Sequence, residues 1–144
     1  MLAGAAAIWH NPVMRMIMAI LSLLTGGPLA AGEPLSANAF DAYTRGKTLY
    51  YAHQGETYGV ERYLPGRKVI WSFLDGDCRQ GRWYEEGGMI CFVYEDRPDP
   101  QCWHFEQGPG GLIARFENDP EATTLYEARD LDEDMICYGP KIGV

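Results

Sequence analysis

The chain has 144 residues, with 12 Lys and Arg against 20 Asp and Glu, so its formal net charge is −8. This length favours a single domain, and a composition with 47% hydrophobic residues excludes a disordered or collagen-like chain. The acidic balance leaves no surplus of cations for phosphate groups. It therefore argues against nucleic acid or an anionic membrane surface as a partner.

The N-terminal residues have the pattern of a secretory signal. Arg15 precedes an apolar run, Met16–Leu24, and mainly small residues follow up to Gly32. The run is shorter than the roughly 20 apolar residues of a transmembrane helix, so we expect no stable membrane anchor. We predict a signal peptide over residues 1–32, in which 1–13 is an extension from a misplaced start codon. A single domain over residues 33–144 would then be exported to the periplasm or the extracellular space.

All four cysteines lie in the predicted domain. Removing residues 1–32 removes Arg15 and no acidic residue, which leaves 112 residues with 11 basic and 20 acidic side chains, a charge of −9. An even number of cysteines in an exported chain predicts two disulfides. A zinc site is the competing interpretation, but the spacings of 13, 11 and 35 residues contain no Cys-x-x-Cys pair. We expect no metal and no cofactor.

One short helix precedes a series of short strands. Ser36 is placed as the N-cap of a helix over Ala37–Thr44, and Gly46 follows where a left-handed residue would end it. From Lys47 onward, β-branched and aromatic runs alternate with turn residues every 8 to 12 positions. We predict eight strands at about 48–53, 58–63, 68–74, 78–85, 89–95, 101–107, 112–117 and 123–128.

Short reversals between the strands determine the predicted fold class. Gln54-Gly55-Glu56, Asp75-Gly76-Asp77 and Glu86-Gly87-Gly88 are examples, and they imply that sequence neighbours pair antiparallel. We predict an all-β domain, an antiparallel up-and-down meander closed into an eight-stranded barrel, because closure removes exposed strand edges. An open sheet covered by the helix is the alternative.

Side-chain alternation predicts the disulfide pairing. Folding a hairpin about a turn at Arg97–Pro100 places Cys91 opposite Cys102, with Phe92 and Trp103 on the other face. By elimination, Cys78 pairs with Cys137 and ties the C-terminal segment to the fourth strand.

Two resemblances bear on this fold. Gly81-Arg82-Trp83 resembles, locally, the Gly-x-Trp arrangement of lipocalin and avidin barrels, in which the Trp plugs one end; a core Trp beside a Gly that permits close strand approach is the other interpretation. A wider set of segments resembles an uncharacterised family of small exported alphaproteobacterial β proteins. That resemblance implies export and a β domain and implies no activity. Its segments are Gly46–Leu49, Tyr58–Glu61, Cys78–Trp83, Ile90–Glu95 and Cys102-Trp103.

Several residue patterns could carry chemistry but lack a necessary part. Asp130–Asp134 begins like a calcium loop, yet Met135 and Lys141 stand where Gly and Glu are needed, so a solvated acidic segment is favoured over weak calcium binding. His53 and His104 are expected to be exposed and to lie apart. Glu61 and Glu95 lie in strands beside aromatics and could act as a carboxylate pair in a barrel mouth, but the sequence does not set their separation.

The aromatic content gives the leading hypothesis, a non-catalytic protein that binds a small or apolar ligand inside the barrel. Trp71, Trp83, Tyr94 and Trp103 are the predicted ligand-binding residues, because amphipathic aromatics line such pockets. The alternative is an acidic module that binds a basic protein, such as an inhibitor of a basic hydrolase of the lysozyme kind. A small hydrolase that uses Glu61 or Glu95 with a histidine ranks third.

Overall fold

The computed structural model of the protein describes residues 32–117, 123–129 and 134–138. These residues belong to a unit that spans Gly32–Val144. The predicted signal peptide lies outside the described residues, apart from Gly32. Within the described ranges, no helix is long and apolar enough to cross a membrane.

The helix forms as predicted. Helix α1 spans Ala37–Thr44, and the Ser36 side chain accepts a hydrogen bond from the Ala39 amide at 3.1 Å. Such a cap satisfies one of the free amides of the first turn. Gly46 follows the helix with a φ of 78°, a left-handed conformation that favours glycine.

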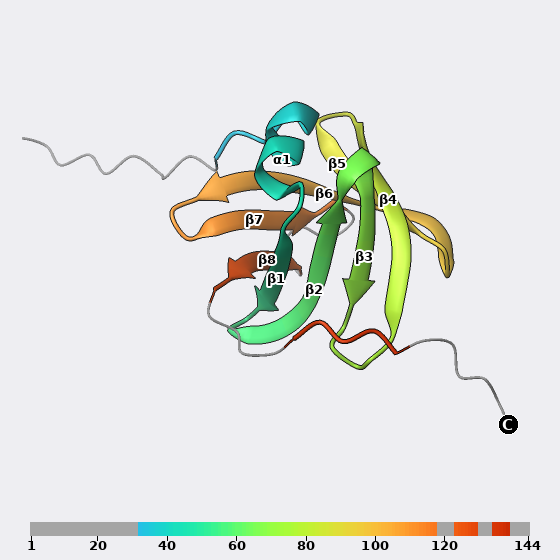
Figure 1. The fold of residues 1–144 in the computed structure, drawn as a ribbon. Coiled ribbons are helices and arrows are strands. Elements are labelled where there is room, and N and C mark those ends of the chain that lie inside the picture. The colour runs from blue at the N-terminus through green and yellow to red at the C-terminus, as the bar shows by residue number, and fades with distance from the viewer. Residues whose placement is uncertain (1–31, 118–122, 130–133, 139–144) are drawn as a thin grey trace, which may run out of the picture. The chain divides into compact units, whose positions relative to one another are not determined.

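Eight antiparallel strands form a closed barrel in sequence order, which confirms the predicted fold class and excludes the open sheet. Strand β8 closes the barrel by pairing with β1, where Tyr51 lies opposite Glu127. Helix α1 lies across one end of the barrel (Figure 1). The strands are β1 (Thr48–His53), β2 (Glu56–Leu64), β3 (Lys68–Ser72), β4 (Cys78–Glu86), β5 (Met89–Tyr94), β6 (Arg97–Gly108), β7 (Gly111–Phe116) and β8 (Thr124–Ala128), with a 3-10 turn at Pro65–Arg67.

Aromatic and aliphatic side chains at alternate strand positions point into the barrel and form its core. Phe40 of α1 is fully buried and packs against the side chains inside the barrel. It therefore connects the helix to the interior, and α1 covers that end of the barrel. The buried members of this core are Phe40, Leu49, Tyr51, Tyr63, Val69, Trp71, Trp83, Ile90, Phe92, Trp103, Phe105, Leu112, Ala114 and Leu125.

The β5–β6 hairpin confirms the predicted pairing but corrects the predicted turn. Cys91 lies opposite Cys102 and forms a disulfide with it, with Cα atoms 4.0 Å apart. The reversal is at residues 95–96, however, and Arg97–Pro100 belong to β6. A register irregularity between Phe92 and Tyr94 keeps Cys91 opposite Cys102 although the chain reverses at residues 95–96. Proline fixes a φ that extended backbone tolerates, so a Pro-rich segment is compatible with such an irregular strand.

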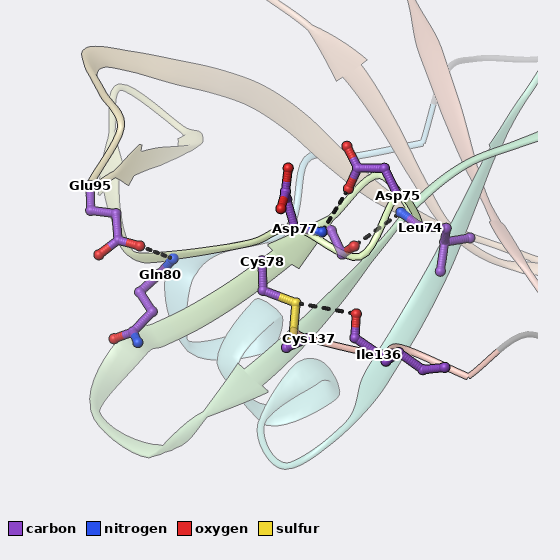
Figure 2. Close-up of a disulfide and its surroundings, with 9 residues drawn as sticks. Leu74, Asp75, Asp77, Cys78, Gln80, Glu95, Ile136 and Cys137 are labelled. Carbon is purple, nitrogen blue, oxygen red and sulfur yellow. Dashed lines mark hydrogen bonds between the residues drawn. A yellow bond between two sulfur atoms is a disulfide. The ribbon is translucent and has the colours of Figure 1, made fainter. Parts of the chain in front are cut away.

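The second disulfide joins Cys78 at the start of β4 to Cys137, as predicted (Figure 2). The Tyr138 amide also donates a hydrogen bond to the Gly76 carbonyl at 3.0 Å. In the same loop, the Asp77 amide donates to the Asp75 carboxylate at 3.0 Å (Figure 2). Residues 134–138 are thus fixed to the loop between β3 and β4. Two disulfides in so short a chain indicate an oxidising, non-cytoplasmic location.

Candidate ligand-binding cavity

A cavity of about 70 Å³ lies inside the barrel. All eight strands contribute to its wall, because the inward positions of each strand point to the same interior. Polar side chains are found both deep within it and at its rim. The lining residues are Tyr51, Tyr58, Glu61, Tyr63, Trp71, Phe73, Arg79, Phe92, Tyr94, Asp96, Arg97, Gln101, Trp103, Phe105, Ala114 and Leu125.

Gly59 allows one wall of the cavity to form. A Cβ atom at Gly59 would lie 2.2 Å from Cζ2 of Trp71, a distance that no real side chain tolerates. The missing side chain therefore lets the indole of Trp71 lie against β2. Glu61 follows at the next inward position of β2 and pairs with Trp71 across the strands.

Glu61 is a carboxyl group inside an otherwise aromatic interior. Its residue is 1% exposed. The Tyr94 hydroxyl donates to it, at 3.2 Å from Oε1 and 3.1 Å from Oε2. Burial raises the pKa of Glu61 well above its usual 4.5, and the Tyr94 hydrogen bond opposes this only in part. The three ion pairs among the described residues involve other carboxylates, so Glu61 has no cationic partner there.

Two further tyrosines add hydroxyl groups to the interior. The Tyr51 and Tyr63 hydroxyls are 2.8 Å apart and share a hydrogen bond. Burial raises the pKa of both phenols above their usual 10, and it raises that of Tyr94 as well, with the neighbouring Glu61 adding to the effect. All three phenols are therefore neutral at physiological pH. Each can donate and accept hydrogen bonds.

The rim of the cavity carries charge. Arg79 at the start of β4 donates from Nε to Oδ2 of Asp96 at 2.5 Å, and its guanidinium lies 5.0 Å from the ring centre of Phe73. The Nη1 atom of Arg79 is buried and has no hydrogen-bond partner among the described residues. Buried guanidinium donors are normally paired, so this atom is available to an acceptor from outside the chain.

The cavity continues outward into a wider depression of about 460 Å³. The two share Tyr58, Arg97, Gln101 and Trp103. Typical ligand pockets measure roughly 300–1,000 Å³, so the depression has room for a ligand body that the inner cavity lacks. The shared residues place the depression next to the cavity.

Three of the four predicted ligand-binding residues line this cavity. Trp71, Tyr94 and Trp103 are in its wall, whereas Trp83 is not. Trp83 points into the barrel nearer to α1, where its ring is 5.1 Å from that of Phe40, and Arg67 lies over it at 4.5 Å. Trp83 thus packs beneath the helix at the covered end. Alternation along a strand predicts whether a side chain points into the barrel. It does not predict how far along the barrel axis that side chain lies.

The polar members of the site were not predicted as ligand contacts. Glu61 was weighed as a catalytic partner of Glu95, but the structure does not bring the two together. Glu61 is buried inside the barrel, while Glu95 is exposed and accepts a hydrogen bond from the Gln80 amide at 3.3 Å. Arg79 was not singled out at all. Arg79 lies four positions before Trp83 on β4, so the two share a strand face. This spacing is the signal that would have predicted an inward position for Arg79.

His53 and His104 are not among the residues that line the cavity. His53 Nδ1 is 3.0 Å from the Thr124 carbonyl, and His104 Nδ1 is buried without a hydrogen-bond partner. Both residues are half-buried rather than exposed as expected. Of the acidic segment Asp130–Asp134, only Asp134 is among the described residues, so the calcium hypothesis falls outside them.

Comparison of the chain with family models, with curated proteins and with solved structures found no match. The resemblances based on the sequence therefore stay predictions. The geometry of the cavity is the basis for assigning a function.

Proposed function

We propose that the protein is an exported, non-catalytic binding protein for a small ligand, which it holds inside the barrel. The observation that carries this proposal is the cavity itself, an aromatic chamber that contains a buried carboxyl group and whose rim has a buried guanidinium nitrogen with no hydrogen-bond partner among the described residues. Binding sites for small molecules combine such a largely apolar wall with a few polar groups that orient the ligand.

The polar groups narrow the class of ligand. A purely hydrocarbon ligand would bury Glu61 and the tyrosine hydroxyls without offering them hydrogen bonds, which costs free energy. We therefore infer a ligand with an apolar body and a polar group that reaches Glu61. Its remaining atoms would occupy the outer depression beside Trp103.

The arrangement of groups supports binding rather than catalysis. A Ser, Thr or Cys nucleophile activated by an adjacent base is a common catalytic arrangement, and no such side chain is among the residues that line the cavity. Glu61 is engaged by Tyr94, and His53 and His104 are not among the residues that line the cavity. The alternative of a basic protein partner rests on the charge of −9 over residues 33–144 and on the two disulfides, and it predicts binding outside the barrel.

A cavity-filling variant tests the proposal. The full chain is expressed with both disulfides formed, native mass spectrometry identifies any retained ligand, and thermal shifts measure binding of a panel of small polar-headed compounds. Ala114 lines the cavity and is 1% exposed, so Ala114→Leu should fill the chamber and abolish binding. Ala42→Leu makes the same change at an exposed position of α1 and should leave binding intact.

The outcomes decide between inner and outer binding. Loss of binding in Ala114→Leu but not in Ala42→Leu supports a ligand inside the barrel. Unchanged binding in Ala114→Leu, or an empty wild type that no member of the panel stabilises, overturns the proposal. If Ala114→Leu does not fold, quenching of tryptophan fluorescence in Trp83→Phe provides a second test, because Trp71 and Trp103 are then the reporters within the barrel.

A further inference from the structure

We propose, on the basis of the proposed function, that the ligand is a small organic ammonium ion whose cationic end lies against Glu61 and the aromatic rings around it. This inference specifies the charge and chemical class of the ligand.

Glu61 has no cationic partner among the described residues, so its carboxyl group is favoured in the ionised form only when a cation enters the chamber. Its residue is 1% exposed, and within the described part of the chain its hydrogen bonds come from the Tyr94 hydroxyl, a neutral donor. Buried charges in proteins are ordinarily paired or bound to a cation. An ammonium group at this point would supply both the opposite charge and up to three N–H donors.

The wall of the cavity is suited to a cation. Trp71 lies with its ring centre 6.5 Å from that of Tyr51 and 5.9 Å from that of Tyr58, while Phe92 and Tyr94 stack at 6.3 Å. The faces of such rings carry negative charge density and attract ammonium groups, most strongly where water is excluded. These rings and Glu61 line the same chamber, so a cation that reached Glu61 would lie among them.

Every titratable or charged group that faces Glu61 fits this assignment. Tyr51 on β1, Tyr63 on β2 and Tyr94 on β5 are neutral phenols, and β3 contributes the uncharged Trp71. The charged groups of the cavity, Arg79 on β4 with Asp96 and Arg97 after β5, lie at the rim. An anionic ligand would be drawn to these arginines, and its charge would then stay at the entrance instead of reaching the inner chamber.

Binding of an ammonium ion is coupled to a proton. Burial holds the pKa of Glu61 above its usual value, so the carboxyl group of the empty protein is protonated at pH values at which a free carboxyl is ionised. The ammonium ion replaces this proton, which leaves to the solvent, and an ion pair remains. Affinity for an ammonium ligand should therefore rise with pH, by up to tenfold per unit below that pKa. Affinity for a neutral ligand should not rise with pH.

Three probes of matched length test the inference by isothermal titration calorimetry on the full chain. These are butylammonium, butan-1-ol and butyrate, which share a four-carbon scaffold and differ in charge. We expect butylammonium to bind at least about tenfold more tightly than butan-1-ol at pH 8, a difference of 1.4 kcal/mol. The preference should shrink at pH 5. Butyrate should bind more weakly than butylammonium at both pH values.

Two variants show whether Glu61 is the cause. Glu61→Gln keeps the shape of the side chain and removes its charge, so the preference for butylammonium should disappear while butan-1-ol binding is retained. Glu86→Gln makes the same change at an exposed position at the other end of β4 from Arg79 and should keep the preference. If Glu61→Gln does not fold, the change in butylammonium affinity of the wild type between pH 5 and pH 8 tests the role of Glu61 independently.

Each result has one meaning. Equal affinity for butylammonium and butan-1-ol, or a preference that survives in Glu61→Gln, overturns the ammonium inference and leaves the small-ligand function standing. Tighter binding of butyrate overturns it in favour of an anion held by Arg79 and Arg97. No binding of any probe, together with no effect of Ala114→Leu on the wider panel, overturns both proposals.

Discussion

The two ends of the barrel are built differently. At the closed end, Phe40 of α1 contacts four aromatic rings inside the barrel, with ring centres 4.6 to 6.4 Å away: Tyr63, Trp83, Phe92 and Phe105. At the open end, Phe73 is 45% exposed and Arg79 has a buried nitrogen without a partner. Packing is therefore complete at one end, whereas the other keeps space and unused hydrogen-bonding capacity.

This difference separates stability from binding. Burial of apolar surface is the main stabilising contribution in a small domain, and the fully buried ring of Phe40 supplies part of it beneath the helix. The open end forgoes part of that stabilisation, and the polar and aromatic groups there stay accessible to a ligand. Substitutions at the two ends should accordingly affect different measurements.

The largest expected effect is at the closed end. Phe40→Ala should lower the free energy of unfolding by about 3–5 kcal/mol, because it removes a fully buried ring and leaves a void among four others. Urea denaturation measures the loss. Phe73→Ala at the open end is the matched control and should cost less than about 1 kcal/mol, since the ring is partly exposed. Comparable losses in both variants would show that the two ends are packed alike.

The two disulfides provide the next comparison. The Cys78–Cys137 bond closes a loop of 59 residues and the Cys91–Cys102 bond one of 11. Chain entropy predicts stabilisation of about 4 and about 3 kcal/mol, respectively. Paired Cys→Ser variants should follow this order in urea denaturation. Because the longer bond acts mainly on the unfolded chain, its removal should leave ligand affinity nearly unchanged. A large loss of affinity would mean that residues 134–138 help to shape the site.

The fold was predictable because its signals are local. Turn residues recur at regular intervals, and β-branched and aromatic runs alternate between them, so the strands and the barrel follow from neighbouring residues. The pairing of Cys91 with Cys102 was predictable for the same reason. The turn itself was misplaced, since Pro98 and Pro100 are typical of turns but lie in β6, and the reversal is at Glu95 and Asp96.

The site was less predictable because it depends on distances between strands. The aromatic content identified Trp71 and Trp103 as ligand-binding residues, but the height of Trp83 along the barrel depends on how all eight strands are staggered. Glu61 stands out because no cationic side chain pairs with it among the described residues. The sequence around Glu61 does not reveal this, because such a partner could come from any strand. Arg79 is similar, since its unpaired nitrogen is visible only once Asp96 is placed beside it.

The third effect depends on pH and compares two buried carboxyl groups. Burial raises the pKa of Glu61, so between pH 4.5 and that raised pKa the folded protein holds a proton that the unfolded chain has released. Stability contributed by this group is therefore complete below about pH 4.5 and is lost as the pH rises. Glu61→Gln does not titrate. It should gain stability over the wild type with increasing pH, by at most about 2 kcal/mol at pH 6.

Glu106 should show the opposite trend. Its carboxylate bonds to Arg115 Nη1 at 2.8 Å, and this hydrogen bond lowers its pKa. The stability contributed by Glu106 is present above its ordinary pKa and is lost as the pH falls. Glu106→Gln should therefore have a lower free energy of unfolding than the wild type at pH 6. The difference between the two should disappear under acid conditions. Urea denaturation of both variants from pH 3 to pH 8 measures the two slopes. Parallel slopes would show that Glu61 is ionised and paired in the empty protein, and the chamber would then need no cation from outside.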